Sequence, residues 1–525
     1  MNLLVRFAGF LAILLDKIIT PILGLLDWLP KPKIPAITDE VLLYSACRLS
    51  RMIRNRELSC EYVVTAYINR IKEVNPIINA VSDERFIEAL DESKSIDLFL
   101  KNTKISLDKL ENLKPFLGVP ITFKESCGVK GLSMSAGSCP RKDIKASEDS
   151  EAVRRLKLAG FIPLLVTTVP EYCVSLETIN LLTGCTRNPY NIRRTSGGSS
   201  GGEGALIGSG SSVVGLGTDL AGSIRIPCLF NGIYGHKTTS NAVPYTGFYP
   251  DSSDNRTYEY YSIGPMTRYV EDLKPLLKII SGPEGSNLKL DQKVDLTELK
   301  VLYSNSEYNL FGIPKVQKEI RDGINEARNF LISNYQMETE EIKIQDLKKG
   351  FEISAMMFMS LKGMPKFLQD PQNPKEEANL FVEILKNILG RSRFSLYLLM
   401  TIVFYRYNGF MPRKHLPFYQ EKLETLKKAF LESLGDNGIF VYPTFPSSAF
   451  RHYQVFTRMY GVCYSMIFNV MGCPSTQIPI GFDKHGMPIG LQIVAGPNQD
   501  RLCLAVAEEL SKHFGGWVPP TTVEI

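Results

Sequence analysis

Residues 197–227, GGSSGGEGALIGSGSSVVGLGTDLAGSIRIP, limit the possible folds of this chain more than any other stretch. The stretch holds ten glycines, yet it also contains the apolar runs 205–207 and 213–214, which flexible Gly/Ser linkers lack. It is therefore predicted to be folded. Glycine lets a backbone approach a ligand closely and leaves main-chain N–H groups free to donate. We interpret this stretch as the floor of an active site.

Composition excludes several other classes of protein. The chain has 525 residues, 44% of them hydrophobic, which is enough apolar material for a large core. Its net charge of +5 is spread along the sequence, so a nucleic-acid partner is not expected, whereas a weak attraction to anionic lipid stays open. The ten cysteines show no paired C-x-x-C spacing and the five histidines lie far apart, so we expect no metal, no cofactor and no histidine-based triad.

Periodicity and capping residues predict alternating helices and strands. Thr38 and Asp39 can cap a helix running towards Arg54, and Ser59 can cap another through Lys72. Strands are expected at 79–81, 116–123 and 162–166, and further helices at 83–100 and 151–159. This alternation predicts an α/β fold in which helices cover both faces of a large twisted sheet.

The N-terminal segment 3–29 is strongly apolar but is interrupted by Arg6, Asp16, Lys17 and Pro21. A secretory signal fits poorly because no small-residue cleavage site follows. A membrane anchor, either spanning the bilayer or lying in its interface, fits better, and a helix packed on the protein body is the third alternative. We therefore expect a membrane anchor at 1–30, a linker at 31–36 and a catalytic domain at 37–525.

Two motifs can be read in more than one way. The loop 197–201 matches G-x-S-x-G, the nucleophile elbow of α/β-hydrolases, but a polar turn at 188–195 precedes it where that motif needs a strand. Lys124 ends the apolar run LGVPITFK, and a lysine at a strand end is usually a solvated charge. Neither motif alone identifies an active site.

Taken together, GVPITFKE, GGSSGG and GTDLAGSIRIP closely resemble the motifs of the amidase signature family, hydrolases with a Ser-Ser-Lys triad. The resemblance implies that Ser223 is the nucleophile, that Lys124 is the base, and that Ser199 bridges them after a cis peptide bond from Gly198. It also implies an oxyanion hole and residues that brace it. The main-chain donors are those of Leu220, Ala221, Gly222 and Ser223, and the bracing residues are Ser200, Asp219 and Arg225.

A triad without histidine requires an unusual lysine. The amine can accept a proton near neutral pH only if burial lowers its pKa, so Lys124 is expected to be buried. Ser199 can then pass a proton from Ser223 to Lys124 and later return it to the leaving nitrogen. Ala221 stands where many members of the family have glycine, and its methyl group is tolerable if φ there is negative.

Substrate-contacting residues are less well defined by the sequence. Tyr172, Cys173, Met356, Met357 and Met359 are candidates for a substrate channel, and core packing is their alternative. The apolar run 394–404 has arginines on both sides, within an insert near 391–414. This pattern is typical of an interfacial helix, with a buried core helix as the rival. The side chains expected to contact membrane are those of Leu398, Leu399, Ile402 and Phe404.

Within the amidase signature family, these membrane features look like those of the animal fatty-acid amide hydrolases. That resemblance implies hydrolysis of N-acylethanolamines and primary fatty-acid amides through an acyl-enzyme, with lipid amides and membrane lipids as partners. It also implies a membrane location, on the endoplasmic reticulum or on lipid droplets. The alternatives are the amidase subunit of a tRNA-dependent amidotransferase, a general small-amide amidase and a non-catalytic lipid-binding module. The oligomeric state stays open, a homodimer included.

Overall fold

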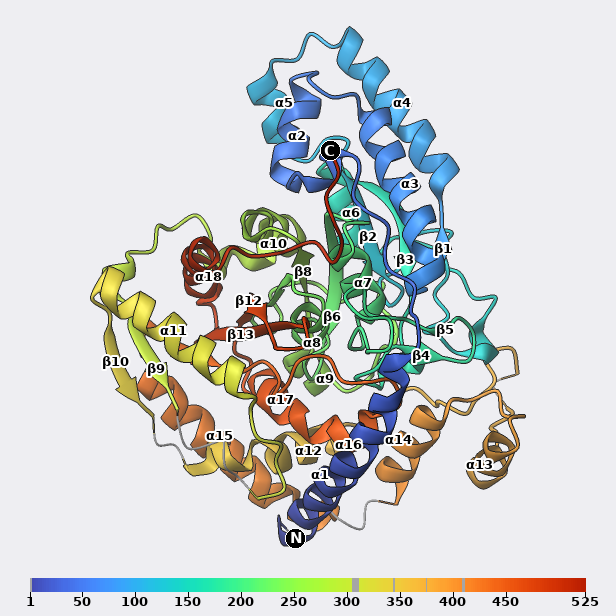
Figure 1. Cartoon of the computed structure of the whole chain (residues 1–525), viewed down its shortest axis with the longest axis vertical. Helices are drawn as coiled ribbons and strands as arrows, with labels where there is room; N and C mark the ends of the chain where they lie inside the picture. Colours follow the sequence, from blue (N-terminus) through green and yellow to red (C-terminus); the bar gives the residue numbers. More distant parts are fainter. Residues whose placement is uncertain (1, 305–310, 343–344, 374, 408–410) are drawn as a thin grey trace.

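The computed structural model of the chain describes residues 2–304, 311–342, 345–373, 375–407 and 411–525. An eleven-stranded mixed sheet runs through the molecule in the order β1-β3-β2-β6-β8-β7-β12-β13-β11-β9-β10 (Figure 1). Its strands are β1 (Val81–Glu84), β2 (Pro120–Lys124), β3 (Ile162–Thr167), β6 (Val214–Asp219), β7 (Tyr234–Lys237), β8 (Ser262–Thr267), β9 (Lys300–Tyr303), β10 (Glu338–Glu341), β11 (Gly438–Tyr442), β12 (Ser475–Phe482) and β13 (Pro488–Ala495). A separate small sheet pairs β4 (Ile179–Asn180) with β5 (Gly184–Cys185).

Helices flank the large sheet and confirm the expected α/β class (Figure 1). They are α1 (Asn2–Gly24), α2 (Ala46–Arg54), α3 (Cys60–Ile78), α4 (Phe86–Asn102), α5 (Leu107–Leu113), α6 (Glu151–Leu158), α7 (Gly201–Gly208), α8 (Arg225–Phe230), α9 (Arg256–Tyr260), α10 (Leu273–Ser281), α11 (Lys318–Tyr335), α12 (Gly350–Ser360), α13 (Leu380–Ile388), α14 (Leu396–Arg406), α15 (Leu416–Leu434), α16 (Val455–Arg458), α17 (Cys463–Val470) and α18 (Asp500–Phe514). The stretch 197–227 is folded, as predicted, into α7, β6, the turn after β6 and the start of α8.

Capping residues set the helix starts, and one of them differs from the prediction. The Ser59 side chain accepts from the Tyr62 N–H and begins α3, as expected. Asp39 instead caps a short 3-10 turn at 40–43, and the helix that ends at Arg54 begins after Ser45, whose side chain accepts from the Arg48 N–H. The extended backbone at Tyr44 and Ser45 separates the 3-10 turn from the helix, where the sequence pattern predicted one continuous helix.

Parallel pairing brings the predicted site together. Strands β3, β2 and β6 are neighbours and run in the same direction, with Thr122 of β2 opposite Gly215 of β6. The carboxyl ends of parallel strands meet at one edge of a sheet, which is where such folds bind ligands. Lys124 at the end of β2 therefore lies beside the end of β6 and the turn that follows it.

Helix α1 packs against the protein body, and its charged residues explain how. Arg6 forms an ion pair with the buried Glu352 of α12, with 2.6 Å between Nε and Oε1. Asp16 pairs with Arg458 of α16, with 2.6 Å between Oδ2 and Nη2. The opposite face is apolar and exposed. It includes Leu3, Leu4, Phe7, Phe10, Leu11, Leu14, Leu15, Ile18 and Ile22. Among the described residues, no helix combines the length and apolar character needed to cross a membrane, so the expected spanning helix is not found.

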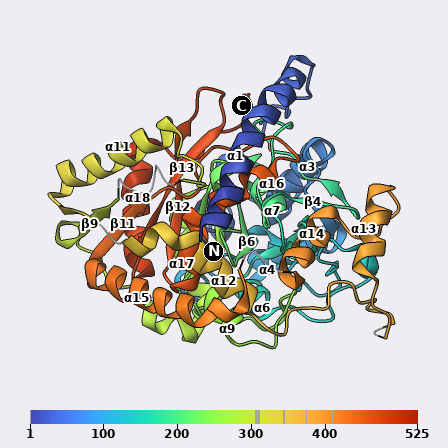
Figure 2. The same ribbon diagram turned by 90° about the horizontal axis from the view of Figure 1, so that it is seen from below.

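The helix predicted to touch lipid is mostly buried, which corrects the sequence interpretation. In α14, Leu398 and Leu399 are 0% exposed and Ile402 is 3% exposed, whereas Phe404 is 42% exposed. The three buried side chains pack with Leu368 and with Tyr172 of the segment before β4. The flanking arginines suggested a surface helix, but α14 lies between α1 and α13 (Figure 2). The run 394–404 has no polar face, so the sequence could not show which side of the helix is buried.

Candidate active site

Lys124 is a buried amine with two hydroxyl neighbours. It ends β2, every residue of which is buried, and its side chain is 0% exposed. Its Nζ lies 2.7 Å from Ser199 Oγ and 2.7 Å from Thr218 Oγ1. Burial, the largest influence, lowers the pKa of Lys124 below its ordinary value, and nearby acidic groups oppose it only in part. The amine can therefore lose its proton more readily than that of a surface lysine.

Ser199 lies between this lysine and the turn after β6. The Gly198–Ser199 peptide is cis, as the resemblance implied, and Ser199 is 2% exposed. The next residue, Ser200, donates its N–H to the Ser223 carbonyl oxygen over 3.2 Å and its hydroxyl to the Thr218 carbonyl oxygen over 3.4 Å. No strand runs through residues 186–198, all of them described, so the loop is not the strand-borne nucleophile elbow of an α/β-hydrolase.

Ser223 stands in the tight turn between β6 and α8. Its side chain is half-buried, whereas Lys124 and Ser199 are buried behind it, so Ser223 is the hydroxyl that an incoming molecule can reach. Gly222 adopts φ of 119°, and a Cβ there would lie 2.7 Å from the Ile226 side chain, so only glycine fits this position. The neighbouring Ala221 does not have a positive φ, and its methyl group is tolerated as predicted.

The main-chain donors of this turn are fewer than the resemblance implied. The Gly222 N–H donates to Asp219 Oδ1 over 2.7 Å, so in this structure it is occupied by the turn itself. Within the described part of the chain, the N–H groups of Leu220, Ala221 and Ser223 have no hydrogen-bond acceptor. In this structure these three N–H groups are therefore free to donate to a bound molecule.

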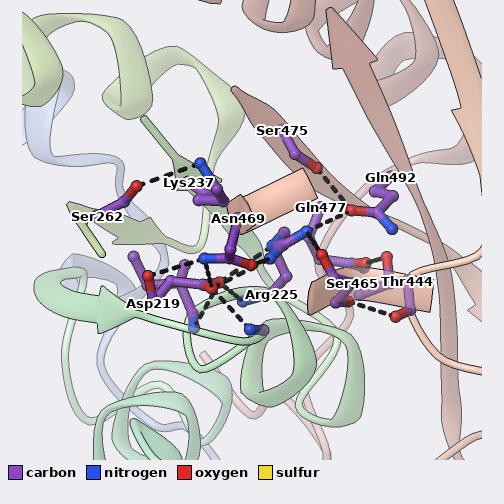
Figure 3. Close-up of polar contacts among 12 residues, drawn as sticks. Asp219, Arg225, Lys237, Ser262, Thr444, Ser465, Asn469, Ser475, Gln477 and Gln492 are labelled. Atoms are coloured by element: carbon purple, nitrogen blue, oxygen red, sulfur yellow. Dashed lines mark hydrogen bonds and ion pairs between the residues drawn. The ribbon is translucent and has the colours of Figure 1, made fainter. Parts of the chain in front are cut away.

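A buried ion pair holds the turn in place (Figure 3). Asp219 and Arg225 are both 0% exposed, with 3.0 Å between Oδ2 and Nε. Burial alone would raise the pKa of Asp219, but Arg225 and hydrogen bonds outweigh it and hold that pKa well below its ordinary value. Arg225 also donates to Gln492 Oε1 over 2.9 Å and to Asn469 Oδ1 over 2.6 Å. The bracing role expected for Asp219 and Arg225 thus has a specific geometry, and Asn469 and Gln492 extend it.

We expect Arg225→Ala to destabilise the protein strongly. Removing the guanidinium leaves the Asp219 carboxylate buried without its counter-ion, a change that typically costs about 3–5 kcal/mol. Chemical denaturation followed by tryptophan fluorescence would measure the loss. Arg154→Ala is the matched control, because the Arg154–Glu151 pair lies on the surface, where solvent screens the pair and its loss changes stability little. Equal stabilities of the two variants would contradict the bracing role.

Two further polar residues of the site were not singled out from the sequence. Thr218, at the end of β6, accepts a hydrogen bond from Lys124. Glu203 in α7 is buried beneath the site, where Thr122 and Thr167 donate to its carboxyl group, and burial raises its pKa to about 8. Thr218 could have been found from the parallel pairing of β2 and β6, whereas Glu203 offered no signal because it looks like an ordinary helix residue.

The residues proposed to line a channel fall into two groups. Cys173 lies close enough to Lys124 and Ser199 for both to influence its pKa, which burial raises, and Tyr172 packs against α14. Met356 and Met357 are 1% exposed and belong to the main core, with Met359 packed against it. The structure thus brings Cys173 to the site but leaves the three methionines in the packing of α12. In the described part of the chain, no group of three or more metal-binding side chains is present.

Comparison with known proteins agrees with this geometry. A family model described as Amidase matches residues 62–504, so the chain belongs to the amidase family and is an amide-hydrolysing enzyme. It is 39% identical to fatty-acid amide hydrolase 2-A of Danio rerio over 94% of this chain and 93% of the relative. It is 37% identical to human fatty-acid amide hydrolase 2 over 94% and 92% of the two chains.

More distant relatives share the fold. An acetamidase of Emericella nidulans is 25% identical over 91% of this chain and 90% of the relative. A solved structure titled fatty acid amide hydrolase superposes with a TM-score of 0.69 at 20% identity, covering 91% of this chain and 86% of the other. At that identity the superposition establishes the amidase fold and no finer property.

Proposed function

We propose that this chain is a membrane-associated hydrolase of fatty-acid amides that uses Ser223, Ser199 and Lys124 as its catalytic triad. The observation that carries the proposal is the buried Lys124 amine, 2.7 Å from Ser199 Oγ and beside the turn that holds the half-buried Ser223. The names of the 37–39% identical relatives support the fatty-acid amide as the substrate class.

The first half of the mechanism forms an acyl-enzyme. Neutral Lys124 accepts the proton of Ser199, which accepts that of Ser223, and the Ser223 oxygen attacks the amide carbonyl carbon. The resulting oxyanion receives hydrogen bonds from the free main-chain N–H groups at 220, 221 and 223. Removing one such donor typically costs about 100- to 1000-fold in rate.

The second half releases the two products. The proton held by Lys124 returns through Ser199 to the leaving nitrogen, so an amine or ammonia departs rather than its anion. Water then takes the place of the amine. Its oxygen attacks the acyl carbon while its proton passes through Ser199 to Lys124. That proton then returns through Ser199 to the Ser223 oxygen as the bond between Ser223 and the acyl carbon breaks and the fatty acid leaves.

Exposed apolar faces on two helices support membrane attachment. One is the outer face of α1, and the other is on α13, where Phe381, Leu385, Ile388 and Leu389 are between 60% and 75% exposed. Arg391, which is exposed, lies shortly after the end of α13, beyond Leu389 and Gly390. Helices α1 and α13 both lie near α14 in the two views (Figures 1 and 2). Apolar helix faces with basic neighbours bind bilayer interfaces, so we place the protein on the membrane surface through α1 and α13.

We expect the triple change of Leu385, Ile388 and Leu389 to serine to weaken binding to anionic vesicles by about tenfold or more, since each buried CH₂ contributes about 0.8 kcal/mol. These side chains are exposed, so thermal stability should stay nearly unchanged. Flotation with vesicles of phosphatidylcholine and phosphatidylserine measures the binding. The control is Leu398→Ser in α14, where the side chain is buried. This variant should lower the thermal stability of the protein, whereas the triple variant should not. Unchanged flotation of the triple variant would show that α13 is not part of the attachment.

The substrate class is tested directly with the full-length protein. Vesicles containing a long-chain primary amide or an N-acylethanolamine are incubated with the enzyme, and free fatty acid is measured by mass spectrometry. We expect release of fatty acid, with a higher kcat/KM than for a two-carbon amide. A preference for the short amide would favour a general small-amide amidase.

A further inference from the structure

A second cluster of reactive side chains lies outside the proposed triad. Cys185 of β5 has its sulfur 3.3 Å from Nδ1 of His452. The same ring nitrogen lies 2.8 Å from Oε1 of Glu177, whose side chain is 0% exposed. A thiol, an imidazole and a buried carboxylate are thus in direct contact, although His452 is more than 260 residues away from the other two in sequence.

The contacts of His452 require a charged ring. Its Nδ1 faces the Glu177 carboxylate, and its Nε2 lies 3.1 Å from the carbonyl oxygen of Ile192. Both partners accept hydrogen bonds, so both ring nitrogens carry hydrogen and the ring is an imidazolium. Burial opposes this charge, but hydrogen bonds and charges from Cys185 and Glu177 outweigh it and raise the pKa of His452 to about 10. The Cys185 sulfur therefore lies against a cation, the kind of surroundings in which cysteines react readily with electrophiles.

Cys185 also differs from the other cysteines in its surroundings. It is half-buried, so a small reagent can reach it, and its neighbours Gly184 and Arg187 are exposed. The other half-buried cysteines are Cys47, Cys139, Cys173 and Cys463. Burial raises the pKa of each of these four thiols, which keeps them protonated and poorly nucleophilic.

The cluster lies directly behind the proposed active site. A Cβ placed on Gly198 would be 3.0 Å from the Glu177 nitrogen, so the backbone of Glu177 is packed against the Gly198–Ser199 peptide. The next residue, Thr178, donates its hydroxyl to the Gly197 carbonyl oxygen over 2.8 Å. A displacement of Glu177 would therefore reach the loop that holds Ser199.

We propose that Cys185 is a modification site for small α,β-unsaturated carbonyl compounds, and that its alkylation inhibits the hydrolase. The Cys185 thiol gives up its proton to water as its sulfur forms a bond to the β-carbon. The carbon–carbon π bond breaks, and the resulting enolate takes a proton from water at its α-carbon. The sulfur becomes a thioether that carries an added group, so its contact with the His452 ring changes. The added group must also be accommodated beside a His452 side chain that is 13% exposed. Inhibition rests on the proposed role of Ser199, whereas selective alkylation does not.

The test uses the full-length protein and N-ethylmaleimide. After timed exposure and quenching, digestion and mass spectrometry give the extent of labelling at each of the ten cysteines. We expect Cys185 to react about ten times faster than the four other half-buried cysteines. Amide hydrolysis should fall with the same time constant as labelling of Cys185.

Two variants make the result decisive. Cys185→Ala should hydrolyse amides at the basal rate of the natural protein. N-ethylmaleimide should inhibit this variant more slowly than it inhibits the natural protein. His452→Gln should slow labelling of Cys185 by about tenfold, because the cation is lost. The alkylation site is overturned if another cysteine reacts first. The inhibition is overturned if Cys185→Ala is inactivated as fast as the natural protein, or if labelled protein keeps full activity. The comparison of labelling rates among the half-buried cysteines uses the natural protein alone, so it tests the alkylation site even if His452→Gln does not fold.

Discussion

Ser223→Ala should abolish amide hydrolysis, with a loss of about 1000-fold or more in kcat, since a covalent mechanism has no path without its nucleophile. Ser223 is the half-buried hydroxyl next to the free N–H groups of Leu220 and Ala221, whereas Ser199 and Ser200 are buried behind it. The variant should fold normally, because the Ser223 contact that the turn uses, acceptance from the Ser200 N–H, involves its main chain. Steady-state hydrolysis of a lipid amide measures the effect.

A fluorophosphonate probe separates loss of the nucleophile from loss of the fold. The natural protein should be labelled at Ser223, and Ser223→Ala should not be labelled at all. Ser95→Ala, an exposed serine on α4, serves as the control and should behave like the natural protein. Retention of more than a few per cent of activity by Ser223→Ala would remove this residue from the mechanism, and absence of labelling in the natural protein would favour a binding module.

The sequence predicted those features that depend on local pattern. Ser59 caps α3 because a serine before an apolar-periodic run can accept from the first free N–H groups. Lys124 lies at the end of a buried strand because the mostly apolar run 119–123 leads up to it from Gly118. The three motifs of the family then brought Lys124, Ser199 and the turn of Ser223 to one edge of the sheet.

Features that depend on long-range contacts could not be predicted in this way. Arg6 and Asp16 look like interruptions of an apolar helix, and only the fold shows that Glu352 and Arg458 neutralise them. The lipid-facing role expected for Leu398 failed for the same reason, since the elements that cover α14 come from distant parts of the chain.

The direction of the Gly222 N–H is another such feature. It depends on the Asp219 rotamer, which Arg225 of the same motif and the distant Asn469 fix together. Motif matching could therefore not show that the turn itself occupies the Gly222 N–H.

Lys124→Ala should lower amide hydrolysis as deeply as loss of the nucleophile, but ester hydrolysis less. An amine cannot leave without a proton, whereas an alkoxide can, so the relay from Lys124 through Ser199 matters more for amides. A matched pair of substrates, one amide and one ester of the same fatty acid, measures the difference in kcat/KM. General acid–base catalysis contributes about 100- to 10,000-fold, and we expect the amide to lose the larger share of it. Equal losses on both substrates would show that Lys124 does not deliver the proton.

The pH dependence of the same variant tests the protonation state. Only neutral Lys124 can accept the proton, so activity of the natural enzyme should rise with pH through the lowered pKa of Lys124, and Lys124→Ala should lose this rise. The free energy of unfolding should also rise with pH. The unfolded chain holds the lysine proton up to about pH 10.4 while the folded chain releases it earlier, so folding becomes more favourable as pH rises between the two values. Thermal unfolding across this range should show that slope in the natural protein and a smaller one in Lys124→Ala. A pH-independent activity in the natural enzyme would mean that the lysine is not the group that titrates during catalysis.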